Sequence, residues 1–185
     1  GVIEVRRGED GIRAWAAEPG EYYHAYDGEY GGLWRRNGRP PQQLCGIGFS
    51  SQGKFQGTYY RRAAGADKPE TNWIFEGVPD RIIGDFGLSG GGAAGFELDR
   101  ADIKLGTPHN TVILATSESP QNHFMLVPEE MLTNDTTISG ESHEDLIRAD
   151  MVYFDCPGGG AVFSVGSITF CGSLSHNNYD NNISR

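Results

Sequence analysis

Three carboxylates that could do chemistry lie close together, directly after a glycine-rich run: Glu97, Asp99 and Asp102. Alternate residues of a β-strand point to the same face, so we expect Glu97 and Asp99 to lie side by side. A carboxylate next to bare glycine backbone can act as a general base or hold a polar group of a substrate. The alternative is a solvated strand edge on which these carboxylates pair with Arg100.

The glycine-rich run over residues 87–95 has two interpretations. Its backbone N–H groups could form a cradle for an anion. However, the run lacks the G-x-G-x-x-G spacing, and no Lys-Ser or Lys-Thr pair follows it, so it matches neither nucleotide-binding motif. We favour a tight crossing, where glycine lets one backbone segment pass close to another.

Histidine and cysteine give weaker signals. No histidine pair has HxH or HxxxH spacing, so a metal site within this chain would need ligands from distant segments. The histidines are His24, His109, His123, His143 and His176. The three cysteines, Cys45, Cys156 and Cys171, form no CxxC pair, and their sparse, odd number fits a reducing compartment such as the cytoplasm. No activating base is evident, so we expect Cys45 and Cys171 to be buried and inert.

The elements that position these residues are expected to be mostly strands. Residues 149–174 give the clearest pattern, a C-terminal β-hairpin with a Cys-Pro-Gly-Gly-Gly turn. Residues 111–116 predict a buried strand, and 18–43 an aromatic, glycine-rich loop. Further strands are expected at 2–7, 12–17, 44–49, 58–61, 72–75 and 96–99, and short helices at 124–133 and 141–148. The sequence therefore predicts a strand-rich α/β or α+β domain.

Composition excludes several classes of protein. The chain has 185 residues and a formal net charge of −10, which disfavours binding to nucleic acid. Its 11% aromatic content is too high for a disordered chain, and no apolar run is long enough to span a membrane. The chain opens inside a strand-like pattern without Met and stops at a possible helix start. We therefore expect residues 1–185 to be a piece of a larger protein.

Four long segments together carry a resemblance to a known family: 18–24, 28–36, 83–100 and 159–174. They closely resemble the C-terminal domain of the large (beta) subunit of N,N-dimethylformamidase and its relatives. The resemblance implies that residues 1–185 are the C-terminal part of a single catalytic domain with part of a class I glutamine amidotransferase-like fold. It also implies an iron-dependent amidohydrolase that converts an N-substituted formamide into formate and an amine. The family's iron ligands, a Tyr, a His and a Glu, are expected upstream of Gly1, with none in this chain, so the chain alone should be inactive.

The resemblance also implies site residues and partners. Glu97 matches a family carboxylate that works near the iron, and would be the acid/base. Arg6 or Arg7 matches less directly a basic residue that orients this carboxylate or stabilises charge, where a lysine is expected in the family. The implied partners are a small amide substrate, a small accessory subunit and further copies of the chain, with no nucleic acid and no membrane. Two alternatives remain: a non-catalytic binding or assembly module that uses the aromatic loop 18–36, and a thiol amidotransferase that uses Cys45 or Cys171.

Overall fold

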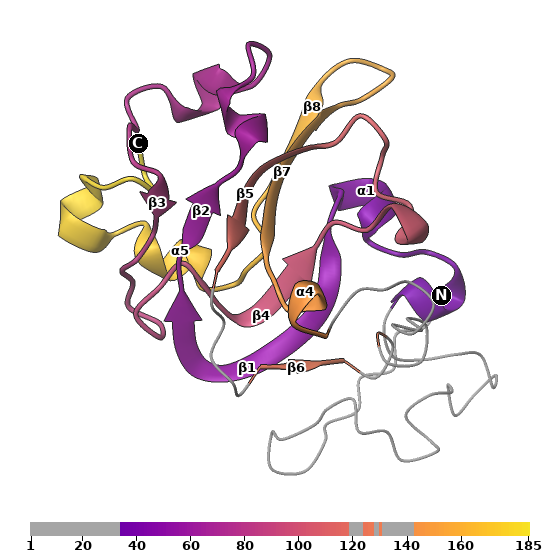
Figure 1. Cartoon of the computed structure of the whole chain (residues 1–185), viewed down its shortest axis with the longest axis horizontal. Coiled ribbons are helices and arrows are strands. Elements are labelled where there is room, and N and C mark those ends of the chain that lie inside the picture. The colour runs from indigo at the N-terminus through magenta and orange to yellow at the C-terminus, as the bar shows by residue number, and fades with distance from the viewer. Residues whose placement is uncertain (1–33, 119–123, 128–129, 131–142) are drawn as a thin grey trace.

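The computed structural model describes residues 34–118, 124–127, 130 and 143–185, and its strands form two sheets (Figure 1). The three-stranded sheet has the order β4-β1-β6, with β1 at Gly48–Thr58, β4 at Ala94–Arg100 and β6 at Met125–Leu126. The five-stranded sheet has the order β3-β2-β5-β7-β8, with β2 at Tyr60–Arg62, β3 at Ile82–Ile83, β5 at Val112–Ser117, β7 at Asp150–Asp155 and β8 at Ala161–Ser164. Every pairing between the described strands is antiparallel.

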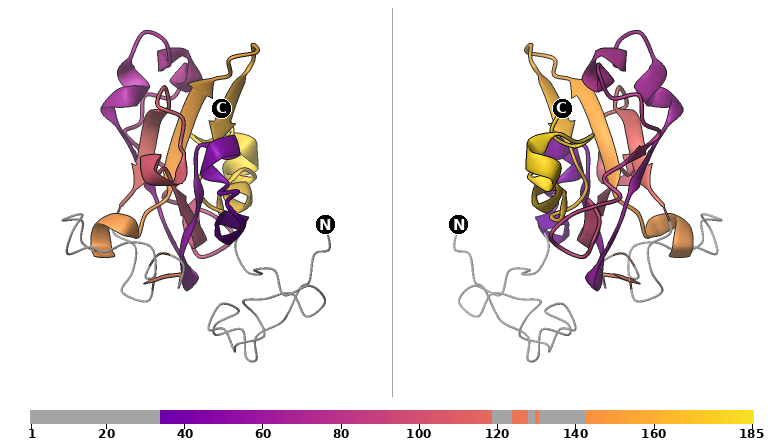
Figure 2. Two further views of the ribbon diagram at one scale, coloured as in Figure 1. Left: turned by 90° about the vertical axis from the view of Figure 1, so that its right-hand side faces the viewer. Right: turned by 90° about the vertical axis from the view of Figure 1, so that its left-hand side faces the viewer.

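The helices of the described residues are short. The α-helical turns are α1 at Gln42–Cys45, α4 at His143–Leu146 and α5 at Phe170–Ser173. The 3₁₀ turns are η2 at Trp34–Asn37, η3 at Ala64–Asp67, η4 at Asn72–Phe75, η5 at Ile103–Leu105 and η6 at His176–Tyr179. Figure 2 shows α1 on the same side of the molecule as the C-terminal segment, with α4 on the opposite side. The fold is therefore strand-rich and mixed α/β, as predicted.

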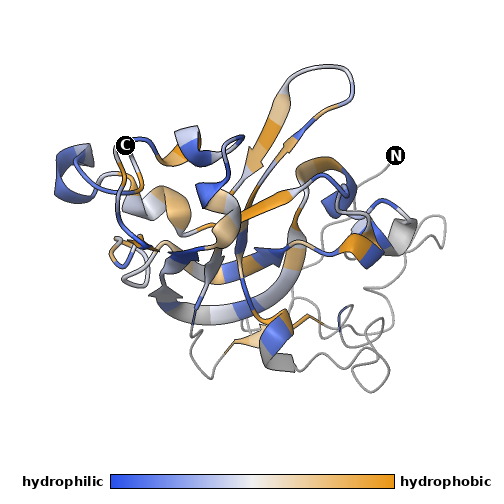
Figure 3. Cartoon of the chain, turned by 45° about the horizontal axis from the view of Figure 1, so that its top comes forward, coloured by the Kyte–Doolittle hydropathy of each residue, from blue (hydrophilic) through white to orange (hydrophobic). Residues whose placement is uncertain are grey.

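The main core lies between the two sheets. Its buried side chains come from both sheets, with Leu98 from β4, Tyr60 from β2 and Leu114 from β5 at 0% exposure and Met151 from β7 at 2%. Figure 3 shows the hydrophobic colour concentrated in the central strands, while η6 is hydrophilic. Strand β5 lies in the middle of the larger sheet and buries Leu114 and Ala115 in this core, whereas Ile113 is 37% exposed, so the strand is not buried throughout as predicted.

Strand β1 connects the two sheets. It is long and strongly curved, and only Tyr59 separates its end from β2 (Figure 1). Its pairing with β4 is interrupted twice, between Phe49 and Ser51 and between Gln52 and Gly57. Extra residues on one strand of an antiparallel pair bend that strand, so these irregularities account for the curvature that brings β4 over the larger sheet.

The glycine-rich run proves to be a tight crossing of backbone segments. A Cβ atom on Gly92 would lie 2.3 Å from the carbonyl oxygen of Thr58, and a Cβ on Gly95 would lie 2.7 Å from the Cα of Gly57. Both distances are too short for any side chain larger than hydrogen. Glycine at these positions thus lets the strand entering β4 pack against the end of β1.

Several predicted elements are confirmed. The strands expected at 96–99, 58–61 and 111–116 correspond to β4, β2 and β5. The C-terminal hairpin is β7–β8, in register through Phe154 and Val162. Helix α4 lies within the helix predicted at 141–148. The predicted hairpin 2–7 with 12–17 and most of the loop 18–43 lie outside the described residues.

Four predicted elements were wrong in part or in whole. Residues 72–75 form the 3₁₀ turn η4, which begins after a turn and has Trp73 Nε1 donating to the Glu70 carbonyl. The strand at 44–49 begins only at Gly48, because α1 occupies the preceding residues and leaves Leu44 77% exposed. Residues 125–126 of the predicted helix 124–133 pair with β1 as β6. The return strand of the hairpin ends at Ser164, and α5 begins at Phe170.

Candidate active site

Glu97 and Asp99 lie two residues apart on β4, where they face Gln52 and Phe49 of β1. Both are half-buried, and neither carboxylate has a hydrogen bond or ion pair within the part of the chain that the structure describes. Burial first, and then the negative charge of Glu97, raises the pKa of Asp99 from 3.8 to about 7. The two carboxylates are therefore close neighbours in a partly desolvated position, as the alternation of the strand predicts.

The outer edge of β4 is held by the segment that follows β8. Ser167 Oγ accepts from the Gly95 N–H and donates to the Gly95 carbonyl, both at 2.7 Å. The Asp99 N–H donates to the Gly166 carbonyl at 2.8 Å. A Cβ on Gly166 would lie 2.3 Å from the Asp99 carbonyl oxygen, so this close approach requires glycine. Residues 166 and 167 thus fix β4 on both sides of Glu97.

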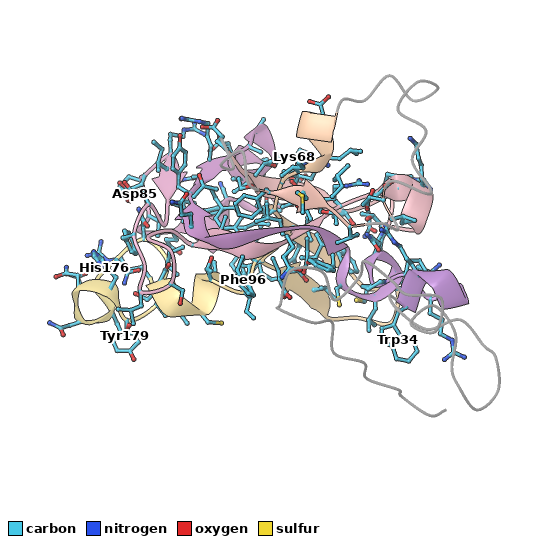
Figure 4. The ribbon with its side chains drawn as sticks, turned by 90° about the horizontal axis from the view of Figure 1, so that it is seen from below. Trp34, Lys68, Asp85, Phe96, His176 and Tyr179 are labelled. Carbon is cyan, nitrogen blue, oxygen red and sulfur yellow. The ribbon has the colours of Figure 1, made fainter. Side chains whose placement is uncertain are left out.

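An apolar cavity of about 430 Å³ adjoins this position. Phe96, the residue before Glu97, lines it together with Leu88, Ile168 and Gln56. Phe96 has a φ of 64°, a left-handed conformation that is unfavourable for a bulky residue and that often marks a functional position. Figure 4 shows Phe96 beside the C-terminal segment that carries α5. With Leu88 84% exposed and Ile168 58% exposed, the pocket offers an open apolar surface, and Glu97 follows Phe96 in the chain without lining it.

Asp102 has a structural role instead. Its carboxylate accepts from the Lys104 N–H at the start of η5 and forms an ion pair with Arg100 at 2.9 Å. Arg100 also pairs with Glu130 at 2.7 Å, and Glu130 pairs with Arg35 at 2.7 Å. The expected pairing with Arg100 therefore holds for Asp102 alone, and it is buried rather than solvated. Sequence reasoning missed Arg35 and Glu130, since no spacing connects residues 95 positions apart.

No set of three His, Cys, Asp or Glu side chains that could hold a metal ion is present among the described residues. His176 stacks on Phe86 with ring centroids 4.1 Å apart. Cys45 is half-buried at the end of α1. The prediction that Cys171 is buried was wrong, because α5 leaves it exposed, and Cys156 is half-buried in the hairpin turn.

Tyr60 is a feature that the sequence did not reveal. Its side chain is fully buried, and its hydroxyl has no hydrogen-bond partner among the described residues. Burial, followed by the charges of Asp99 and Asp150, raises the pKa of Tyr60. The sequence Tyr59-Tyr60 does not predict this burial or the raised pKa. Only the folded arrangement brings the Tyr60 phenol near Asp99 and Asp150. Arg6 and Arg7 lie outside the described residues, as do residues 18–33 of the aromatic loop.

The fold and site define a strand-rich, mixed α/β unit with two neighbouring carboxylates on β4 and an apolar pocket lined by Phe96 of the same strand. The chain belongs to the family described as N,N-dimethylformamidase beta subunit-like, C-terminal, which matches residues 2–181. It is 43% identical over 185 residues to the N,N-dimethylformamidase beta subunit of Paracoccus aminophilus and 42% identical to that of Alcaligenes sp.. Each alignment covers 100% of this chain and 24% of the relative, so the chain spans about a quarter of their length. The family resemblance predicted from the sequence is confirmed.

No helix of the described residues combines the length and apolar character that crossing a membrane would require.

Proposed function

We propose that this chain is part of an iron-dependent amidohydrolase that hydrolyses an N-substituted amide, such as a formamide, to a carboxylate and an amine. The observation that carries the proposal is Glu97, half-buried on β4 two residues from Asp99 and directly after Phe96, which lines an apolar pocket. The relatives are named N,N-dimethylformamidase, which supports a small amide with apolar N-substituents as the substrate.

Glu97 would act as the acid and base of this reaction. Hydrolysis of an amide requires a group that takes a proton from the attacking water and a proton for the departing amine nitrogen. A half-buried carboxylate that forms no ion pair with the described residues is suited to both transfers. Arg6 or Arg7 would orient Glu97 or stabilise the negative charge that develops on the amide oxygen.

Iron would supply Lewis-acid activation in such an enzyme. The described residues do not fit an iron site on their own, since no three potential ligands gather among them. We therefore derive no step through the metal from this chain. We propose that the iron ligands come from outside it, and that the chain without them does not turn over substrate.

The proposal extends to the parent domain, the subunit partners and the cellular location of the protein. The two antiparallel sheets would form the C-terminal portion of a larger, glutamine amidotransferase-like catalytic domain. The relatives are named as subunits, which supports assembly with a small accessory subunit and with further copies of the chain. Cys45, Cys156 and Cys171 are all free thiols, which supports a cytoplasmic location.

The test is Glu97→Gln in the complete enzyme that contains this chain, assayed with N,N-dimethylformamide. We expect turnover to fall by about 10²- to 10⁴-fold, the usual contribution of a general acid/base, while iron content stays unchanged. Glu76→Gln is the matched control, because Glu76 is exposed and lies outside the pocket. Wild-type turnover in the Glu97→Gln enzyme would remove Glu97 from the mechanism.

A binding or assembly module is the second candidate. It is favoured by the half-exposed Trp34, which stands at the described end of the aromatic loop. Under this alternative, Trp34→Ala would weaken subunit association in size-exclusion chromatography, and Glu97→Gln would leave any hydrolysis unchanged. Under the amidohydrolase proposal, Glu97→Gln abolishes hydrolysis without altering assembly.

A further inference from the structure

We propose that a pocket lined by aromatic rings, separate from the candidate active site, binds an N-alkylated ammonium ion. The pocket is a cavity of about 350 Å³ and shares no lining residue with the apolar pocket at Phe96. Its volume is in the range of pockets that hold small molecules. Its aromatic lining comes from η4, the β7–β8 hairpin and α5: Trp73, Phe75, Tyr153, Phe163 and Phe170.

Two strands and a 3₁₀ turn bring these rings together. Tyr153 on β7 and Phe163 on β8 lie directly opposite each other in the hairpin, and opposite residues of an antiparallel pair project from the same face. Trp73 of η4 meets Tyr153 edge to face, with ring centroids 5.9 Å apart and planes at 87°. Trp73 is 58% and Phe163 49% exposed, so solvent reaches the pocket. Perpendicular rings form adjacent walls of the pocket, as in the aromatic cages that recognise methylated ammonium ions.

The polar side chains that line the pocket are already engaged within the chain. The Asn182 amide donates to the Ile82 carbonyl at 3.1 Å and accepts from the Gly84 N–H at 3.0 Å. Arg185 Nε donates to Asp180 Oδ1 at 3.1 Å. The pocket therefore offers a ligand ring faces and aliphatic side chains as its main contacts. An N-alkylated ammonium ion suits this surface, because its alkyl groups need no hydrogen bonds and its charge is attracted to the negative faces of the rings.

The charges around the pocket also favour a cation. Among the lining residues Arg185 alone is charged, and the ion pair just described offsets its charge. Asp155 accepts a hydrogen bond from the Tyr153 hydroxyl at 2.9 Å and forms no ion pair with the described residues, so it adds negative charge beside that ring. The Arg62 guanidinium lies 4.4 Å from the centroid of Phe75, which is a cation–π contact within the same group of rings. A positive ligand is thus favoured over a neutral ligand of the same shape.

The inference stands on the geometry of this pocket and does not require the proposed reaction. Aliphatic amines are protonated at neutral pH, as the side chain of lysine is. The amine that the proposed amidohydrolase releases therefore belongs to the same class of ion. The pocket would hold such an ion away from Glu97, since Glu97 is not among its lining residues.

The first experiment compares two probes of similar size on the complete wild-type enzyme, tetramethylammonium and the uncharged tert-butanol. Saturation-transfer difference NMR measures the affinity of each, even when binding is weak. We expect tetramethylammonium to bind about 3- to 30-fold more tightly, which is the advantage that cation–π attraction supplies. Equal or weaker binding of tetramethylammonium would overturn the inference, because the pocket would then be merely apolar. Absence of binding by either probe would overturn it as well.

The second experiment places the bound ion by mutation. Trp73→Leu and Phe163→Leu keep an apolar side chain and remove a ring face, so each should weaken tetramethylammonium binding by about 3- to 30-fold and change tert-butanol binding little. Tyr179→Leu is the matched control, because Tyr179 is an exposed ring that does not line the pocket. Unchanged affinity for tetramethylammonium in both pocket variants would refute the site.

Thermal melts of the variants show whether each one folds, and the wild-type comparison of the two probes decides the inference if a variant does not. Neither experiment measures turnover. Tight binding of tetramethylammonium by an enzyme that does not hydrolyse amides would therefore refute the proposed function and leave the ammonium site in place.

Discussion

Asp99→Asn should change how the stability of the chain depends on pH. An aspartate whose pKa is raised in the folded state binds its proton more tightly there than in the unfolded chain. Between about pH 4 and pH 7 the unfolded chain releases this proton and the folded chain keeps it, so stability falls as pH rises. Above about pH 7 both states are ionised, and the full cost of a buried charge remains.

The magnitude follows from the two pKa values. A shift from 3.8 to about 7, at about 1.4 kcal/mol per pH unit, corresponds to a loss on the order of 4 kcal/mol across this window. Asn is neutral at every pH in the window and carries no such loss. The stability of Asp99→Asn relative to wild type should therefore increase by that amount between the two ends and then stay constant.

Urea unfolding of wild type, Asp99→Asn and Asp85→Asn, at intervals from about pH 4 to about pH 8, measures this difference. Comparison of variants cancels the other titrating groups, which all three proteins share. Asp85 is exposed, so its variant should follow the wild-type curve. A constant difference between Asp99→Asn and wild type over the whole range would refute the reasoning, since it would mean that Asp99 titrates alike in both states.

Three further predictions concern packing. Glu130→Gln leaves two buried guanidinium groups without their shared carboxylate and should cost about 3 to 5 kcal/mol, read from the urea midpoint; a loss below 1 kcal/mol would contradict a buried network. Gly92→Ala should destabilise by about 1 to 3 kcal/mol because its Cβ meets backbone, whereas Gly158→Ala, with open space around it, should change stability by less than about 0.5 kcal/mol in thermal melts. Tyr60→Phe removes a buried hydroxyl without a partner and should keep or raise stability, so a large loss would reveal a hidden hydrogen bond.

The sequence predicted those parts of the fold that depend on local pattern. The apolar run of β5 and the turn chemistry between β7 and β8 act over a few residues, so the alternation of side chains was sufficient to find them. The turn η4 was mistaken for a strand because its apolar residues Ile74 and Phe75 pack against the core from a 3₁₀ turn rather than from a strand. Whether a short apolar run forms a strand depends on whether another strand lies next to it in the folded protein. The local sequence pattern does not contain this information.

For the candidate site too, the sequence predicted the features that depend on local pattern and missed those that depend on tertiary contacts. Glu97 and Asp99 were found because they alternate on one strand. The raised pKa of Asp99, however, depends on burial beneath other elements, and Tyr60 comes near Asp99 only because β1, which pairs with β4, leads directly into β2. The family resemblance selected Glu97 from among many carboxylates, and the structure adds its environment.

The contacts of Ser167 have a consequence for how the protein meets other chains. β4 is the outermost strand of its sheet, and unpaired outer strands commonly recruit a strand from a neighbouring molecule. Here the hydrogen-bonding groups of Gly95 are already taken by a side chain from later in the sequence. A second molecule that added a strand at this edge would first have to break the hydrogen bonds between Ser167 and Gly95. These hydrogen bonds therefore disfavour pairing of another chain with β4 beside Glu97 and Asp99.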